Sequence, residues 1–443
     1  MKNFNFNQLL SEGTKLEPHQ VDGVWFGLKH HWHINADDMG LGKTLQALTI
    51  AFFHQRNKHF PVLCVVPAYL ASNWRNEINK FSATNKTVNV VKDGKEARQM
   101  RGTKEAPEDF VICSYAKIRD NPTLLRKFRM VIWDESHYLK NPESKITQRA
   151  HENLENFAPD VVIQLSGTPI KNRIPEFYSQ MTIPSYNKRK TSGKDVLAMY
   201  SYHQFCSDFC FSRNQRTPYG NVKIFEGMKN IPKLKGLLKG KYLRRKSDVV
   251  DLPDQVHNEV EVEFKDDGVL EEAWKEFNNG SPGANSKNKA QAAKLIAPAT
   301  AEYVNGLLDK GLGPIVIFTD HVESSYLLKQ KIKGKSGRIS GEVGNDTRAS
   351  LVSDFQDGKL DALILTIGAG STGITLHASN QCVVNDPSWV PGDNEQAWKR
   401  IHRMGQDQTC FFHHMVGGKV GKKIRKLLEK KEKVLKEILD KEE

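Results

Sequence analysis

DDMGLGKTL, residues 37–45, has the residue types that hold a polyphosphate. Gly40 and Gly42 let the backbone turn its N–H groups toward phosphate oxygens. Lys43 places a positive charge on the outer phosphates, and Thr44 offers a hydroxyl to a magnesium ion. The stretch therefore predicts a P-loop that binds ATP and Mg²⁺.

The sequence before and after this loop favours the same interpretation. The apolar run at 32–36 predicts a strand and residues 45–53 predict an amphipathic helix, which is the context that a P-loop requires. One residue departs from the general pattern, because Asp37 stands where its first glycine would be. Upstream, the amide of Gln20 has both the donor and the acceptor that an adenine edge needs. For the loop motif alone, a chance glycine turn stays open as the alternative.

A second candidate site follows the apolar stretch 130–133, which predicts a strand. This strand runs directly into two carboxylates, Asp134 and Glu135. At the end of a strand in a nucleotide-binding sheet, the first carboxylate holds magnesium and the second orients and polarises the attacking water. A solvated turn with acidic residues is the alternative for this motif in isolation.

Length and charge limit the class of protein. A chain of 443 residues exceeds one ordinary core, so two or three domains are expected. The net charge of +13 indicates a polyanionic partner, and nucleic acid is the leading candidate. No long apolar run indicates a membrane span, and the N-terminus shows no export signal. We expect a cytoplasmic protein of a bacterium or a phage-infected cell, with its six cysteines reduced.

Apolar strands and amphipathic helices alternate through both halves, which predicts parallel sheets with helical crossovers. In the first half, strands are predicted at 61–66, 110–114, 130–133 and 161–165, with a helix at 73–81. In the second half, strands are predicted at 314–319, 361–366, 381–385 and 409–415, with helices at 322–332, 348–355 and 393–402. The stretch 278–289, rich in Gly, Ser, Asn and Lys, predicts a loop.

Five further segments carry a family resemblance. They are DESHYLKN (134–141), SGTPIKN (166–172), TIGAGSTG (366–373), DPSWVP (386–391) and QAWKRIHRMGQ (396–406). In this order they resemble the motor signatures of Swi/Snf-type superfamily 2 helicases and DNA translocases. Three differences from that family's usual residues are visible: Asp38 for Glu, Ser136 for Ala or Gly, and the pair Ser371 and Thr372 for Gly-Val.

The resemblance implies an α/β fold with two RecA-like parallel-sheet domains in tandem, a helical basic insert and a C-terminal helix. We place the first motor domain at 1–185, the insert at 186–245, the second motor domain at 246–416 and the helix at 417–443. ATP would bind in the cleft between the two motor domains.

The resemblance also implies roles for individual residues. The catalytic residues are Lys43, Asp134, Glu135 and the arginine fingers Arg400 and Arg403. The nucleotide-binding residues are Gln20, Gly40, Gly42, Lys43, Thr44, Leu45, Gly373 and Gln396, and the magnesium ligands are Thr44 and Asp134. Coupling of nucleotide to DNA is assigned to His137, Ser166 and Thr168. DNA contacts are assigned to Pro67, Ser114, Tyr115, Lys140, Asn141, Asn172, Arg213, Arg216, Arg244, Arg245, Thr366 and Trp389.

The insert is basic and carries interleaved aromatic residues, which suits contact with a DNA backbone and stacking on bases. A solvated face over a small helical core remains the alternative. The insert resembles that of the annealing-helicase, fork-remodelling branch. We therefore expect an ATP-dependent motor, acting as a monomer on forked, four-way or duplex DNA, that couples unwinding to annealing. Two alternatives remain: a duplex translocase that displaces proteins without separating strands, and a nucleotide-gated DNA-binding scaffold.

Overall fold

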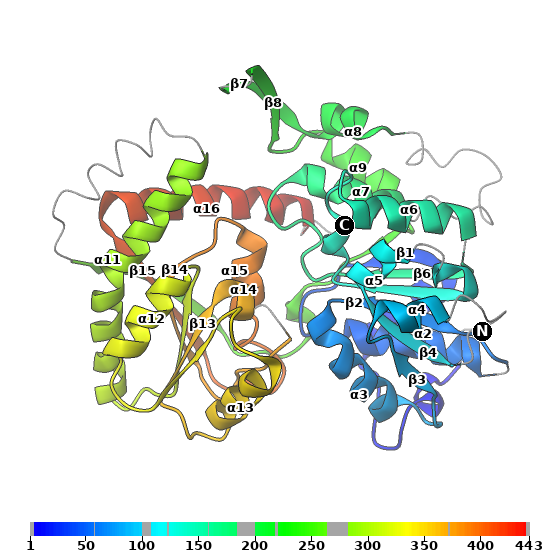
Figure 1. Cartoon of the computed structure of the whole chain (residues 1–443), viewed down its shortest axis with the longest axis horizontal. Coiled ribbons are helices and arrows are strands. Elements are labelled where there is room, and N and C mark those ends of the chain that lie inside the picture. The colour runs from blue at the N-terminus through cyan, green and yellow to red at the C-terminus, as the bar shows by residue number, and fades with distance from the viewer. Residues whose placement is uncertain are drawn as a thin grey trace. The chain divides into compact units, whose positions relative to one another are not determined.

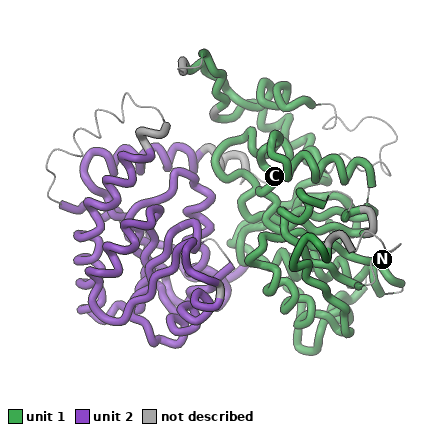
Figure 2. Tube along the Cα trace, in the orientation of Figure 1, with its two compact units in different colours: residues 1–249, 434–443 green, residues 250–433 purple. Residues whose placement is uncertain are grey.

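The structure, a computed structural model, forms two compact units that we describe separately (Figure 2). The first unit contains residues 1–249 and 434–443, and the second contains residues 250–433. The structure describes residues 4–56, 58–99, 108–121, 124–157, 159–183, 200–217, 220–263, 282–370 and 373–439.

The first unit is built on one parallel sheet (Figure 1). Its strands, in spatial order, are β3 (Val88–Val90), β4 (Phe110–Ser114), β2 (Val62–Val66), β5 (Met130–Asp134), β6 (Val161–Leu165), β1 (Trp32–Asn35) and β9 (Tyr242–Leu243). All neighbouring pairs are parallel. The predicted strands β1, β2, β4, β5 and β6 are confirmed, whereas β3 and β9 are too short to give a sequence signal.

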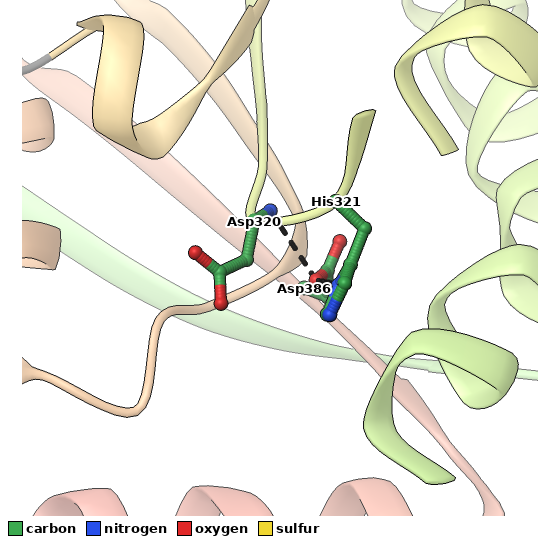
Figure 3. A group of neighbouring side chains, drawn as sticks. All are labelled: Asp320, His321 and Asp386. Carbon is green, nitrogen blue, oxygen red and sulfur yellow. Dashed lines mark hydrogen bonds and ion pairs between the residues drawn. The ribbon is translucent and has the colours of Figure 1, made fainter. Parts of the chain in front are cut away.

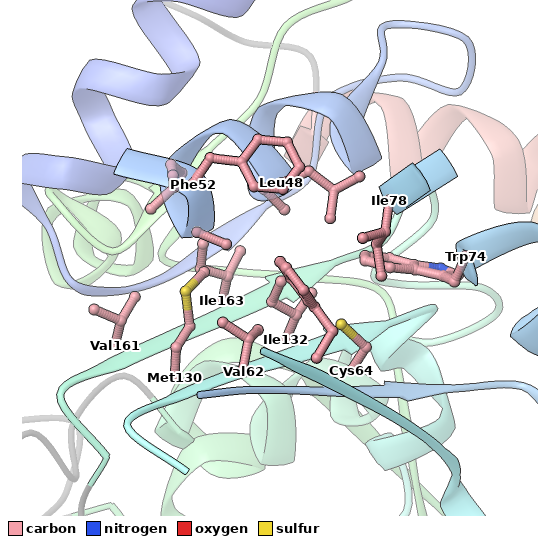
Figure 4. Packing of buried hydrophobic residues seen from close by; sticks show 14 of the residues in the cluster. Leu48, Phe52, Val62, Cys64, Trp74, Ile78, Met130, Ile132, Val161 and Ile163 are labelled. Carbon is pink, nitrogen blue, oxygen red and sulfur yellow. The ribbon is translucent and has the colours of Figure 1, made fainter. Parts of the chain in front are cut away.

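Helices cover both faces of this sheet. They are α1 (Pro18–Lys29), α2 (Lys43–Gln55), α3 (Ala71–Phe81), α4 (Gly94–Gln99), α5 (Tyr115–Asp120), α6 (Lys145–Phe157) and α7 (Tyr178–Thr182). On one face, residues of α2 and α3 such as Phe52 and Trp74 pack on alternate strand residues such as Ile132 (Figure 4). On the other face, residues of α5 and α6 pack on the intervening strand residues, such as Leu63 and Val131, whose side chains point to that side of the sheet. Burial from two sides explains why the central strands are continuously apolar.

The insert is helical only in part. Its described residues form α8 (Tyr202–Phe209), α9 (Ile231–Leu238) and an antiparallel hairpin of β7 (Phe211–Thr217) and β8 (Gly220–Glu226), which the sequence analysis did not predict. Polar residues dominate β7, so the usual apolar alternation that identifies a strand is weak there. Residues 186–199, 218 and 219 of the predicted insert lie outside the described residues.

The second unit also contains one parallel sheet. The order is β10 (Gln255–Val262), β15 (Cys410–Gly417), β14 (Gln381–Asp386), β11 (Ile315–Thr319), β13 (Ala362–Thr366) and β12 (Ser336–Ile339). Its helices are α11 (Pro282–Asp309), α12 (Val322–Lys331), α13 (Asn345–Gln356), α14 (Ile367–Gly370) and α15 (Pro391–Trp398), and α16 (Gly418–Leu439) follows as the predicted C-terminal helix. The prediction of two parallel-sheet domains in tandem is confirmed.

One prediction in this region is wrong. The loop expected at 278–289 is helical from Pro282, where α11 begins. Polar residues dominate this first part, but Lys289 is only 1% exposed and forms an ion pair with Asp320. A contact between residues far apart in sequence therefore stabilises a helix that local composition does not indicate.

Across the described parts of the chain, none of the helices combines the length and apolar character that a membrane span requires. The six cysteines are all free and buried.

Candidate nucleotide-binding site

The P-loop has the backbone that its glycines predict. It connects β1 to α2, and Gly40 and Gly42 have φ angles of 89° and 70°. A Cβ atom on Gly42 would lie 2.2 Å from Nε2 of Gln20, so a residue with a side chain at this position would displace the buried Gln20 amide as well as strain the backbone. Helix α2 begins at Lys43, which places the N–H groups of its first turn beside the loop.

Lys43 bonds to the loop itself in this structure. Its Nζ donates hydrogen bonds to the carbonyl oxygens of Asp37 (2.7 Å) and Asp38 (2.9 Å). Phosphate oxygens are stronger acceptors for an ammonium group than peptide carbonyls, since they carry negative charge. Lys43 would therefore exchange these two bonds when a polyphosphate binds.

Asp134 lies at the carboxyl end of β5 and is held on three sides. Its Oδ2 accepts a hydrogen bond from Trp74 Nε1 (2.8 Å), and its Oδ1 accepts one from the Glu135 N–H (2.9 Å). Its carbonyl oxygen accepts the Tyr115 hydroxyl (2.6 Å). The carboxylate is thereby fixed in orientation, as a metal ligand should be.

Glu135 has a left-handed backbone, with φ 52° and ψ 51°. This conformation is rare for a residue with a side chain and costs of order 1–3 kcal/mol. The strained turn is followed by the short 3₁₀ helix Ser136–Leu139. Strain retained between a strand and a helix is typical of a functional residue.

His137 connects the Glu135 carboxylate to the loop after β6. Its Nδ1 lies 3.1 Å from Glu135 Oε2 and 3.3 Å from Ser166 Oγ. The hydroxyl oxygen of Ser166 in turn accepts a hydrogen bond from the Thr168 N–H at 3.3 Å. The structure thus brings together the three predicted coupling residues and the predicted catalytic carboxylate.

The two carboxyl groups have opposite pKa shifts. Burial, reinforced by the charge of Glu135, raises the pKa of Asp134 to about 7. Burial would also raise the pKa of Glu135, but the hydrogen bond and charge of His137, with the charges of Lys171 and Lys43, outweigh it and lower that pKa to about 2. The group predicted to polarise water is therefore ionised at neutral pH, and cation binding at Asp134 would displace its proton.

The residues present fit a nucleoside polyphosphate with a divalent cation. An ammonium group and a helix N-terminus face the loop, and a carboxylate and the half-buried Thr44 supply oxygen ligands. The loop after β6 also packs closely on this region, because a Cβ on Gly167 would lie 2.6 Å from the Met39 side chain and 3.3 Å from Lys43 Nζ. The carboxyl ends of β1, β6 and β5, which are neighbours in the sheet, thus supply one site.

Gln20 has internal partners in this structure. Its Nε2 donates to the Leu41 carbonyl (3.3 Å), and its Oε1 accepts the Glu17 N–H (3.1 Å). The residue is 4% exposed. The adenine contact stays a prediction, and it would require this amide to exchange both bonds.

The predicted DNA contacts have very different surroundings. Pro67, Tyr115 and Thr366 are buried, whereas Asn141 and Arg213 are exposed. Ser114, Lys140, Asn172 and Trp389 are half-buried.

Arg244 and Arg245 have partners other than the predicted DNA. Their guanidinium groups bind Asp38 and Asp37, the first two residues of the P-loop stretch. The sequence analysis did not find these pairs, and the only signal was that Asp37 replaces a glycine. Trp74 was missed as well, because it belongs to no recognisable motif, and Lys171 was assigned no role although it lies in the 166–172 motif.

The arginine-finger residues lie just after α15 in the second unit. Arg403 Nη1 donates to the Ile374 carbonyl (3.4 Å), and the Arg400 carbonyl accepts the Leu376 N–H (2.8 Å). Gln396 is 3% exposed, and Gly373 has a φ of 58°. The segment with both arginines thus packs on the segment after the 366–373 motif, of which Ser371 and Thr372 lie outside the described residues.

A second polar cluster in this unit contains Asp320, His321 and Asp386 (Figure 3). Their ligand atoms lie close enough to hold a metal ion, but a buried cation is already there. Lys289 Nζ is 2.5 Å from Asp320 and 3.7 Å from Asp386. His321 Nδ1 lies 2.6 Å from Asp386. Burial by itself would raise the pKa of the Asp386 carboxyl group, but His321 and Lys289 keep that pKa below its usual value. We therefore interpret the cluster as an ion-pair network joining α11 to β11 and β14.

Replacing Lys289 with methionine should destabilise the second unit by about 3–5 kcal/mol, because it leaves the buried Asp386 carboxylate and the half-buried Asp320 carboxylate without their cation. Urea denaturation followed through the unfolding of that unit measures the effect. Lys294→Met is the matched control on the same helix, since its ion pair with Glu323 is exposed and should contribute at most about 1 kcal/mol. Equal losses for the two variants would contradict a structural role for Lys289.

Comparison with known proteins identifies the class of this chain. Residues 19–299 match the SNF2-related domain and residues 300–405 match the helicase conserved C-terminal domain. The chain belongs to the SNF2-related family, as the sequence motifs predicted. Membership implies use of a nucleotide, typically with a divalent metal.

Two curated proteins are similar to this chain along most of its length. The chain is 29% identical to the DNA annealing helicase and endonuclease ZRANB3 of Mus musculus over 437 residues, which cover 91% of this chain and 38% of that protein. It is 28% identical to the SWI/SNF-related matrix-associated actin-dependent regulator of chromatin subfamily A-like protein 1 of Xenopus tropicalis, over 96% of this chain and 45% of that protein. The chain thus spans less than half the length of these relatives. Among solved structures, the Sulfolobus solfataricus SWI2/SNF2 ATPase core in complex with dsDNA matches with a TM-score of 0.44 and 23% identity, over 96% of this chain and 93% of that one.

Proposed function

We propose that this protein is an ATP-driven DNA motor that remodels branched DNA, with Mg²⁺ as its metal cofactor. The observation that carries the proposal is the set of Lys43, Asp134, Glu135 and His137 at the carboxyl ends of β1 and β5, the two strands that flank β6 in the sheet. A mere nucleotide-gated scaffold would not need a fixed, ionised carboxylate to polarise water.

Each residue has a defined part in this proposal. Lys43 and the start of α2 hold the phosphates, and Thr44 and Asp134 hold the metal ion, which neutralises charge on the reacting phosphates. Glu135 orients the attacking water, with His137 fixing its carboxylate. Arg400 and Arg403 complete the site when the second domain closes on the first.

Two observations support branched DNA as the substrate. The relatives with 29% and 28% identity include a protein named as a DNA annealing helicase, and the chain carries a net charge of +13. Separating strands costs on the order of 1.4 kcal/mol per base-pair step, and re-pairing at a fork or four-way junction returns about as much. A small motor acting as a monomer would therefore work most readily where unwinding and annealing are coupled.

The hairpin of β7 and β8 is the candidate element that meets the DNA. Antiparallel pairing puts Arg213 opposite Ile224 and Asn214 opposite Lys223, so basic groups extend from both faces. Phe211, at the base of the hairpin, is 59% exposed, whereas Phe205 and Phe209 of α8 are buried in a core shared with β1. The described part of the insert therefore combines a packed helical base with an exposed basic hairpin.

The substrate is tested by measuring ATPase stimulation with single-stranded, duplex, forked and four-way DNA and with RNA. We expect forked and four-way DNA to stimulate most. Strand release should be faster from substrates with homologous arms than from matched substrates without them. Equal rates on both, or stronger stimulation by RNA, would remove the reason for proposing a branched-DNA remodeller, and stimulation by linear duplex alone would favour a translocase that displaces proteins.

Replacing Arg213, Arg216 and Lys223 together with alanine should weaken DNA binding and make it less sensitive to salt. The logarithm of the association constant falls linearly with the logarithm of the salt concentration, and each lost phosphate contact makes this negative slope shallower by about 0.9. Titrations of labelled forked DNA at several salt concentrations measure this slope. A triple alanine variant of Lys331, Lys333 and Lys335, which are exposed in the second unit, matches the change in charge and should keep the parental slope. An unchanged slope in the hairpin variant would assign the hairpin to a solvated surface.

A further inference from the structure

The segment Arg244–Ser247 runs beside the P-loop as an extension of the sheet. Strand β9 pairs in parallel with β1, and the ladder continues past the ends of both strands. The Ala36 N–H donates to the Leu243 carbonyl (2.7 Å), and the Asp38 N–H donates to the Arg245 carbonyl (2.9 Å). The backbone at the start of the phosphate loop is therefore hydrogen-bonded to a segment more than 200 residues away in sequence.

Arg245 is fixed on the carboxylate of Asp37. Oδ1 of Asp37 accepts the backbone N–H and the Nε–H of Arg245, each at 3.0 Å, and Oδ2 accepts an Nη2 hydrogen bond. Gln46 Nε2 also donates to Oδ2 at 3.1 Å. Asp37 is fully buried and the Arg245 side chain is 13% exposed. A glycine at position 37, as the general P-loop pattern has it, could accept none of these bonds.

Arg244 makes an equivalent pair with Asp38. Its Nη2 lies 2.9 Å from Asp38 Oδ1, and its Nη1 donates to the carbonyl oxygens of Ala36 (2.9 Å) and Gly167 (3.3 Å). The other carboxylate oxygen of Asp38 accepts the Ser247 N–H at 3.1 Å. We call the four residues Asp37, Asp38, Arg244 and Arg245 the clasp.

The same two aspartates also accept hydrogen bonds from Lys43. Lys43 Nζ donates to the carbonyl oxygens of Asp37 and Asp38, while their carboxylates hold the arginines. A polyphosphate would draw the ammonium group away from those carbonyls, because phosphate oxygens carry negative charge. The peptide groups that position the clasp therefore change their hydrogen bonds when the site is filled.

The segment that leaves the clasp is bound again in the second unit. Five residues, 248–252, follow Ser247, and then the Pro253 carbonyl accepts a hydrogen bond from His402 Nε2 at 2.6 Å. The Nδ1 atom of His402 lies 2.7 Å from Gln255 Nε2. A carbonyl can only accept, so Nε2 carries the proton and Nδ1 accepts from the amide. His402 lies between Arg400 and Arg403 in the sequence, so this second anchor holds the arginine-finger segment.

We propose that the clasp is a coupling element, which transmits the state of the P-loop along residues 244–255 to the segment with the arginine fingers. The inference rests on the proposed motor function, since it assigns a route by which nucleotide binding alters DNA binding. Arg244 and Arg245 are positioning residues in this scheme and contact neither nucleotide nor DNA. A purely structural clasp would stabilise the first unit but leave the two binding equilibria independent.

The test measures the ratio of DNA affinities with and without ATP, because coupling between two sites is defined by that ratio. The parent protein is the full chain with Glu135→Gln, which prevents turnover during the titration. The dissociation constant for a forked DNA is measured without nucleotide and with saturating ATP. We expect ATP to change it by about 5- to 150-fold, the usual range for coupled sites.

Two variants in this background alter one carboxylate. Asp38→Asn keeps the size of the side chain but removes the charge that holds Arg244, and should bring the ratio below about 2. Asp38→Glu keeps the charge. Glutamate is also the residue usual at this position in the family, so this variant should retain the coupling. Arg149→Met is the control, because its ion pair with Glu152 is exposed and lies outside the clasp. Arg244→Met breaks the same pair from the other side and should reproduce the Asp38→Asn ratio.

The outcomes separate the inference from the proposed function. A parental ratio retained by both Asp38→Asn and Arg244→Met overturns the coupling role alone. Loss of ATP binding in a folded Asp38→Asn protein, or unfolding of both variants, also overturns it, since the clasp would then serve the nucleotide or the fold only. The proposed motor function, and the inference with it, is overturned if the parent protein binds no DNA or if ATP does not change its dissociation constant for DNA.

Discussion

Replacing Glu135 with glutamine should lower kcat for ATP hydrolysis by about 10²- to 10⁴-fold, the usual contribution of a group that removes a proton in the transition state. The carboxylate has the features that this role requires. Burial would raise its pKa, but His137, Lys171 and Lys43 together lower it to about 2, and the backbone of the residue is held at φ 52°. The amide keeps the shape of the side chain but cannot accept a proton. Steady-state ATPase assays with saturating forked DNA measure the loss.

Nucleotide binding should persist in this variant, since Lys43 and the start of α2 are unchanged. Titration with a fluorescent ATP analogue checks this. Glu143→Gln is a suitable control, because Glu143 is an exposed residue of the loop before α6. Turnover close to that of the unaltered protein would show that Glu135 is not the group that polarises water.

Replacing Arg400 or Arg403 with alanine should lower kcat by roughly 10³-fold or more, because arginine fingers contribute about 10³ to 10⁵ by stabilising charge in the transition state. The affinity for ATP should change much less, since this contribution is made mainly in the transition state. Measuring kcat and the dissociation constant for ATP in parallel distinguishes the two effects.

Lys399→Ala is the matched control for both arginines. Lys399 precedes Arg400 in the chain and forms an ion pair with Glu395 at 2.9 Å, so its loss alters the same segment without removing an arginine. Weaker ATP binding with an unchanged rate at saturation would mean that Arg403 binds the ground state and is not an arginine finger.

The sequence by itself determined the central strands of both parallel sheets and the candidate nucleotide site. Strands such as β4 and β6 are buried on both faces, so their apolar runs are visible without any structure. The P-loop was predictable because its glycines and Lys43 act locally, through a short stretch of backbone. Asp134 and Glu135 were predictable for the same reason, since a strand that ends in two carboxylates is a local pattern.

Only the tertiary structure decided the roles of Arg244, Arg245 and Lys289. In sequence, both arginines indicate a basic surface, and Lys289 lies in a polar stretch that predicts a loop. In the structure, each of the three reaches a carboxylate far away in the chain and becomes largely buried. The cost of removing a charge from water selects such pairs, and that cost depends on which groups the fold brings together. Local composition contains no information about that partner, whereas the folded chain supplies it.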